Sequence, residues 1–157
     1  MDKKPTKSDL CQRIDGIVEH WLEQRRALLA EYGNLANIKT FSAEKTLHGT
    51  SLEEFCQSMI DYLSLIHFEI FEQLSQDNWF TNPEGHQQTH SLFDGIQFST
   101  DTLLDFNDKY LAIDDLESLT EDLSSLGEEM AQRFELEDKL IAILRRSRLE
   151  KTPTVPR

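Results

Sequence analysis

The chain has 157 residues, which is enough for one domain with its own hydrophobic core. Hydrophobic residues make up 38% of it and charged residues 29%, with few glycines and prolines, a composition that favours a helical protein over a β-sandwich or barrel. The net charge is -13, and residues 8–144 hold 8 basic against 27 acidic side chains, so this body would repel nucleic acid and attract basic partners.

The sequence contains no apolar run of the length that spans a membrane, and its first ten residues, MDKKPTKSDL, lack the apolar segment of a signal peptide. We therefore expect a cytoplasmic protein with no membrane association. Cys11 and Cys56 have no CxxC spacing, so they are interpreted as small hydrophobic residues rather than as zinc ligands or a disulfide.

The first predicted helix spans residues 8–38, with Ser8 as its N-cap. Its apolar residues recur at three- and four-residue steps and form one stripe, made up of Ile14, Ile17, Trp21, Leu28, Tyr32 and Leu35. Arg25 falls inside this stripe, so its guanidinium must reach solvent or find a carboxylate on a facing helix. Residues 39–50 keep no period and are predicted to be a connection.

The second predicted helix spans residues 51–76 and begins at a capping box formed by Ser51 and Glu54. One broad stripe can face a core, made up of Leu52, Phe55, Met59, Tyr62, Leu63, Ile66, Ile70 and Leu74. The opposite side carries Asp61, Leu65 and Phe68, with Glu54 and Glu72 beside them. Because one helix cannot turn both sides into a small core, either it is buried all round, which its acidic residues make costly, or this second side is an exposed apolar and acidic surface that binds a partner.

Asn-Pro and Glu-Gly pairs predict a loop over residues 77–88. The third helix is expected over about 87–108, with a kink or break near Ser99, where Ser, Thr and Asp residues interrupt its stripe.

The fourth predicted helix starts at Asp114 or Asp115 and runs to the basic residues that end at Arg148. Its stripe repeats with a near-heptad step, through Leu116, Leu119, Leu123, Leu126, Met130, Phe134, Ile141 and Leu144. Glu137 falls on the same stripe, so we predict that it forms an interhelical ion pair with Arg25. The polar tail, residues 149–157, is expected to be disordered.

Four long amphipathic helices predict an all-α, up-and-down four-helix bundle. The expected domain is the whole chain, residues 1–157, with an ordered core over about 8–148.

Sequence patterns for catalysis and metal binding are sparse. The chain has no Glu-x-x-His pair of the kind that holds two irons in a bundle, and no nucleotide-binding or hydrolase motif. We therefore expect no enzyme. The sequence leaves two other functions open. One is a metal- or haem-binding helix bundle, and the other is an acidic adaptor that binds a basic partner.

Three blocks of the chain resemble the Rsd/AlgQ family of bacterial anti-sigma factors. They are WLEQRRALLAEYGNLANIK at 21–39, LEEFCQSMIDYLSLIHFEIFEQL at 52–74 and RFELEDKLI at 133–141, in family order. The phrases FCQ-x-x-x-DY-x-S and RF-x-LEDKLI are the most specific. The resemblance implies a cytoplasmic helix bundle without a cofactor that binds the C-terminal domain of the primary sigma factor, the domain that reads the -35 promoter element.

Such binding implies lower housekeeping transcription, in stationary phase. Asp61 matches an acidic position that the family uses to contact sigma, and Ser64 and Phe68 follow it near one face. Leu65 and Phe68 are expected to supply apolar anchors, with Glu72 beside them. The same apolar residues would support a weak homodimer; otherwise the chain is expected to be a monomer.

Overall fold

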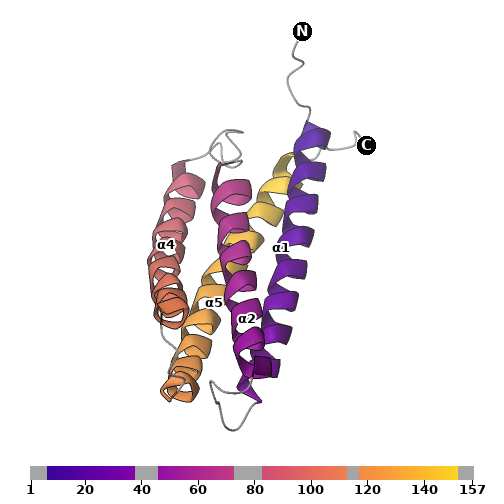
Figure 1. The fold of residues 1–157 in the computed structure, drawn as a ribbon. Helices are drawn as coiled ribbons and strands as arrows, with labels where there is room; N and C mark the ends of the chain where they lie inside the picture. The colour runs from indigo at the N-terminus through magenta and orange to yellow at the C-terminus, as the bar shows by residue number, and fades with distance from the viewer. Residues whose placement is uncertain (1–6, 38–45, 73–82, 113–116, 152–157) are drawn as a thin grey trace, which may run out of the picture.

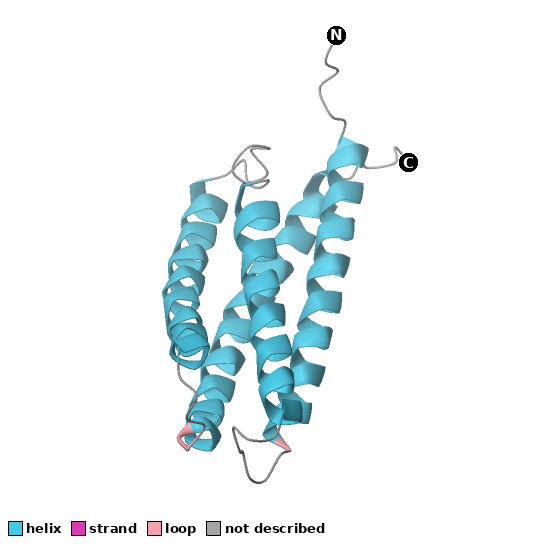
Figure 2. Ribbon diagram, viewed as in Figure 1, coloured by secondary structure: helices cyan, strands magenta, loops and turns pink. Residues whose placement is uncertain are grey.

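The structure is a computed structural model that describes residues 7–37, 46–72, 83–112 and 117–151. Within these ranges the elements are α1 (Lys7–Ala36), α2 (Thr46–Leu65), η1 (Ile66–Phe71), α4 (Pro83–Ala112) and α5 (Leu119–Lys151). The helix η1 is a π-helix that continues α2. Successive long helices run in opposite directions (Figure 1), and the described residues contain no strand (Figure 2). The predicted all-α, up-and-down bundle is confirmed.

The four helices do not pack equally. The most extensive contacts join α4 to α5 and α1 to α2, and α1 also packs on α5. By contrast, α2 and α4 touch over only a few residues. The seam between α2 and α4 is therefore the least closed side of the bundle.

The core consists of the predicted stripes. In α1 and α2, Trp21, Leu28, Phe55 and Met59 are at most 1% exposed. In α5 the stripe residues from Leu119 to Leu144 are buried, apart from Phe134, which is half-buried. Three- and four-residue spacing thus places these side chains inside, as helical geometry requires. Leu74 and Leu116 lie outside the described residues.

Helices α1, α2 and α4 all begin earlier than the sequence predicted. The helix α1 begins at Lys7, so Ser8 is not its N-cap, and α2 begins at Thr46 rather than at Ser51. The segment 46–50 contains no proline, and its one glycine costs a helix only about 1 kcal/mol, so the helix can extend through it. The Ser51 capping box therefore lies inside α2 and does not mark its start.

The helix α4 begins at Pro83, inside the predicted loop, because proline suits the first turn of a helix, where its missing N–H costs nothing. It is also continuous through Ser99, so the predicted break is wrong. The hydroxyl groups of Ser99 and Thr100 donate to the carbonyl oxygen of Ile96, at 2.7 and 3.1 Å, and so bond within the helix instead of ending it.

The helix α5 begins at Leu119, later than Asp114 or Asp115. Residues 117 and 118 form a turn, and the N–H of Asp122 donates to the carbonyl oxygen of Ser118. At its other end α5 reaches Lys151, three residues beyond the expected end of the ordered core. None of the helices in the described part of the chain carries a stretch apolar enough to cross a bilayer.

Candidate partner-binding surface

The predicted partner-binding residues lie on the outer side of α2 and η1, with one exception. Asp61 is exposed and accepts a hydrogen bond from Gln57 Nε2 at 2.9 Å. Ser64 is half-buried, and Glu72 is exposed. The Phe68 side chain is 59% exposed, which is unusual for a phenylalanine. Three- and four-residue spacing sets these four residues along one side of the helix, and they are named here the strip.

Leu65 is the exception, because it is only 8% exposed. The prediction that it lies exposed beside Phe68 is wrong. Glu69 lies one turn after Leu65, and its Oε2 is 3.7 Å from Nδ1 of His20 in α1. The side of the helix that carries Leu65 and Glu69 therefore faces α1. Leu65 is therefore buried beside α1 and cannot be an exposed anchor for a partner.

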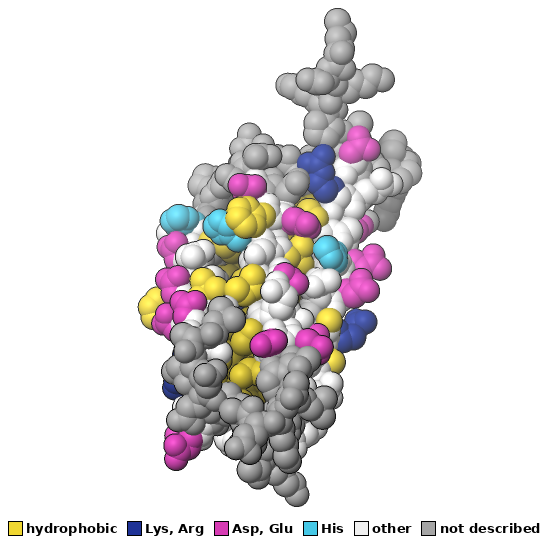
Figure 3. Space-filling view, viewed as in Figure 1, with side chains coloured by type: hydrophobic (Ala, Val, Ile, Leu, Met, Phe, Trp, Pro, Cys, Tyr) yellow, Lys and Arg dark blue, Asp and Glu magenta, His cyan; other side chains and the backbone are white. Residues whose placement is uncertain are grey.

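A groove runs beside the strip, between α2 and η1 on one side and α4 on the other. Its volume is about 240 Å³. Figure 3 shows apolar side chains along this seam, with acidic side chains around them. The lining includes Ser64, Phe68 and Phe71 from the first wall, Gln97, Thr100 and Leu104 from α4, and Arg133 from α5.

Aromatic contacts hold the wall of the groove that η1 provides. The rings of Phe71 and Phe93 stack with their centroids 4.1 Å apart, which joins η1 to α4. The His67 ring meets Phe68 edge to face at 4.8 Å. Phe68 is thus supported from one side while most of its surface is left open.

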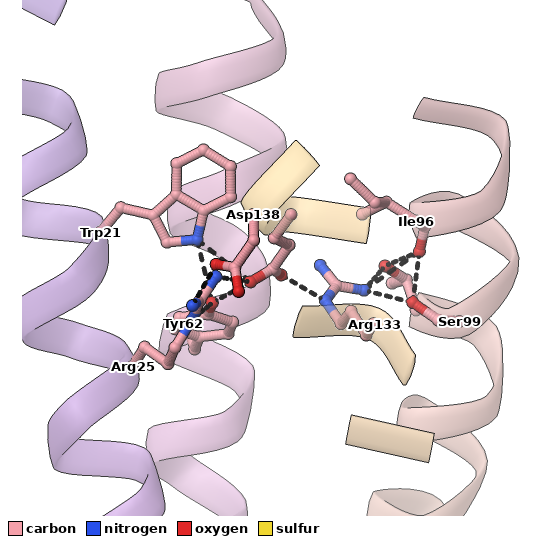
Figure 4. A network of polar contacts seen from close by, with 9 residues as sticks. Trp21, Arg25, Tyr62, Ile96, Ser99, Arg133 and Asp138 are labelled. Carbon is pink, nitrogen blue, oxygen red and sulfur yellow. Dashed lines mark hydrogen bonds and ion pairs between the residues drawn. The ribbon is translucent and has the colours of Figure 1, made fainter. Parts of the chain in front are cut away.

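Behind the groove lies a buried polar network centred on Glu137, which is fully buried. Figure 4 shows the network, in which side chains of α1 and α2 meet those of α5, and Arg133 of α5 extends to Ser99 of α4. One carboxylate oxygen accepts from Arg25 Nη2 at 3.0 Å, from Trp21 Nε1 at 3.2 Å and from the Tyr62 hydroxyl. The other accepts from Arg133 Nε at 2.7 Å. Arg25 and Glu137, which the sequence pairs, are in contact.

The two arginines bring positive charge to Glu137 from different helices. Arg25 also binds Asp138 at 2.6 Å and lies over the Phe134 ring, 4.8 Å from its centroid. Burial, and next the charge of Glu137, raise the pKa of the Tyr62 phenol, so this hydroxyl stays protonated and donates to Glu137. Each side chain in the network already has a hydrogen-bond partner within it. The network therefore stabilises the core of the bundle.

Arg133 connects this network to the groove. Its Nη1 donates to the Ile96 carbonyl oxygen at 3.0 Å, to Ser99 Oγ at 2.9 Å and to Thr100 Oγ1 at 2.6 Å. Arg133 itself is 1% exposed, yet it lines the floor of the groove together with Thr100. Its position four residues before Glu137, on the same stripe, is the signal that would have identified it from the sequence.

Groups of three or more His, Cys, Asp or Glu side chains placed to hold a metal ion do not occur in residues 7–37, 46–72, 83–112 and 117–151.

Comparison with known proteins supports the resemblance that the three sequence blocks carry. The model of the family described as Regulator of RNA polymerase sigma(70) subunit, Rsd/AlgQ, matches residues 3–145. The Regulator of sigma D of Enterobacter sp. (strain 638) is 38% identical over 142 residues, 85% of each chain. The protein of that name from Yersinia pseudotuberculosis serotype O:1b (strain IP 31758) is 34% identical over 140 residues, 84% of this chain and 83% of that protein. The chain therefore belongs to the Rsd/AlgQ family of regulators of the RNA polymerase sigma(70) subunit.

Proposed function

We propose that the chain binds the C-terminal domain of the primary sigma factor through the strip formed by Asp61, Ser64, Phe68 and Glu72. Occupying that domain blocks its contacts with core RNA polymerase and with the -35 promoter element, and so lowers housekeeping transcription in stationary phase. This role places the protein in the cytoplasm. Family membership is the observation that carries the proposal, and the curated relatives share the name Regulator of sigma D.

The charge and shape of the strip support this assignment. A domain that reads promoter DNA must present a basic surface to the phosphates. Asp61 and Glu72 offer carboxylates to such a surface, and the exposed Phe68 ring offers an apolar anchor between them. A partner helix with basic and apolar side chains could bind the carboxylates and the Phe68 ring at the same time.

We infer that α4 completes the binding surface. Gln97, Thr100 and Leu104 form the wall of the groove opposite Ser64 and Phe68. Because α2 and α4 contact each other over few residues, a partner side chain can enter between them without separating packed helices. With Leu65 buried, Phe68 is the one predicted apolar anchor that is exposed, so we expect the protein to be a monomer when sigma is absent.

The test is binding to the isolated C-terminal sigma domain, measured by calorimetry. Asp61→Ala removes an exposed carboxylate that bonds only to Gln57 in the described structure, so the fold should be unchanged while the Kd rises about five- to thirtyfold. Phe68→Ala should have a comparable effect.

Glu135→Ala is the matched control, because it removes one exposed carboxylate from α5, on another side of the bundle. Its affinity should equal that of the wild type. Binding by all three variants at the wild-type affinity would remove the strip from the interface, whereas absence of any complex at low salt would refute sigma binding itself.

A further inference from the structure

Unpaired basic side chains gather on the C-terminal half of α5. Lys139, Arg145 and Arg146, named here the basic ridge, are all exposed, and no ion pair joins them to any residue that the structure describes. Arg25, Lys109 and Arg133, by contrast, are held by carboxylates. Arg26 of α1 is exposed as well, forms no ion pair with the described residues, and lines a pocket with Arg145, Asp15 and Glu19. Most of the unpaired positive charge in the described part of the chain thus lies on the ridge.

Helix stabilisation does not account for the whole ridge. Cations in the last turn of a helix interact favourably with its dipole, but this effect fades within one turn. Lys139 lies about three turns before the end of α5 at Lys151. No ion pair joins Lys139 to Glu135, which is exposed one turn before it. Asp138 is already bound by Arg25 at 2.6 Å.

A groove with an apolar floor lies on each side of the ridge. The groove towards α4 has a volume of about 640 Å³, and Lys139 and Arg146 border it beside Leu92 and Ile143. Gln87, Gln88 and Ser91 add polar groups on its α4 side. The groove towards α1 has a volume of about 500 Å³ and lies between Leu22 and Ile141, next to Arg145 and Arg146. Charge and apolar surface therefore alternate across this part of the molecule.

We propose that the basic ridge and its two grooves form a second interaction surface, which binds an acidic, amphipathic segment of a partner protein. Lys139 and Arg146 are seven residues apart, so their charges stand about 10 Å apart along α5. Carboxylates two turns apart on a partner helix match this spacing, and the aliphatic residues between them match the groove floors. Nucleic acid fits poorly, because the acidic body would repel its phosphates. The surface lies on α5 and is separate from the Asp61 strip.

The experiment uses the full chain and a labelled synthetic peptide of about four helical turns, with glutamate and leucine at three- and four-residue spacing. Fluorescence anisotropy should show saturable binding that weakens at raised salt. The double variant K139Q/R146Q should bind the peptide about five- to thirtyfold more weakly, since two exposed charge pairs are lost. Its affinity for the sigma domain should stay at the wild-type value, which separates this proposal from the preceding one.

The control is S124E/S125E, which lowers the net charge by the same amount at exposed positions near the other end of α5. It should bind the peptide like the wild type. Equal binding by K139Q/R146Q and the wild type, or no saturable binding by the wild type, would overturn the proposal. It would also be overturned if short duplex DNA bound the ridge more tightly than the peptide. Self-association of the wild type but not of K139Q/R146Q in the ultracentrifuge would also overturn it, because the ridge would then bind a second copy of the chain.

Discussion

Glu137 is the residue on which the interior of the bundle depends. Its carboxylate is removed from water and receives hydrogen bonds from Arg25, Arg133, Trp21 and Tyr62. A buried carboxylate is tolerable only with such complete compensation. Removing its negative charge would leave Arg133 without an ion-pair partner among the described residues and Arg25 with Asp138 alone.

Glu137→Gln should lower the free energy of unfolding by about 3 kcal/mol, because the amide leaves Arg25 and Arg133 without their shared buried anion. Chemical denaturation measures the change. Asp138→Asn is the control: this carboxylate binds the same Arg25 but is 61% exposed, so its loss should cost less than about 1 kcal/mol. Equal effects of the two substitutions would contradict the central role of Glu137.

At the scale of the elements, a side chain of α1 packs tightly against α5 at Gly127. The hydroxyl of Tyr32 reaches over this glycine and donates to the Leu123 carbonyl oxygen at 2.7 Å. A Cβ at position 127 would overlap that hydroxyl. Position 127 therefore requires glycine, because the Tyr32 side chain leaves no room for a Cβ atom there.

Gly127→Ala should destabilise the protein by about 1–3 kcal/mol, because displacing Tyr32 outweighs the helix propensity that alanine adds. Gly16→Ala is the matched control in α1, where a Cβ meets no atom within 4 Å and alanine should stabilise by about 0.5–1 kcal/mol. Thermal melts of both variants decide the matter. If Gly127→Ala were as stabilising as Gly16→Ala, the packing of Tyr32 would not be a constraint.

The sequence predicted the interior of the elements better than their ends. Trp21, Phe55 and Met59 follow from helical spacing alone, because periodicity depends on which side is buried. The start of α2 does not follow from the Ser51 capping box, because this box is a local signal and the preceding segment, which contains no proline, is also helical. Pro83 falls within the predicted loop, although proline is equally suited to the first turn of a helix.

The candidate site could be predicted only in part. Asp61 and Phe68 are exposed as expected, whereas Leu65 is covered by its approach to α1, which the pattern of one helix cannot reveal. The groove was not foreseen either, since it arises from the sparse contact between α2 and α4. Both features are tertiary, and they depend on the relative placement of whole helices.

At the scale of the whole molecule, negative charge dominates. The net charge is -13, and self-repulsion of this size opposes the compact state. Raising NaCl from low concentration to about 0.5 M should screen the repulsion and stabilise the fold by about 1 kcal/mol, a rise in Tm of about 2–4 °C. The buried Arg25–Glu137 pair is screened far less. A fall in Tm on adding salt would mean that surface ion pairs outweigh the repulsion.

The π-helical turn η1 has a consequence for how related chains are compared. A π-turn takes up about one residue more than the α-helical turn it replaces. Loss of a single residue within Ile66–Phe71 would therefore restore an ordinary helix and leave the following residues facing the same way. A one-residue gap at this point in an alignment thus keeps Glu72 paired with a residue on the same face, whereas a gap-free alignment with a chain lacking the π-turn would pair Glu72 with a residue from a different face.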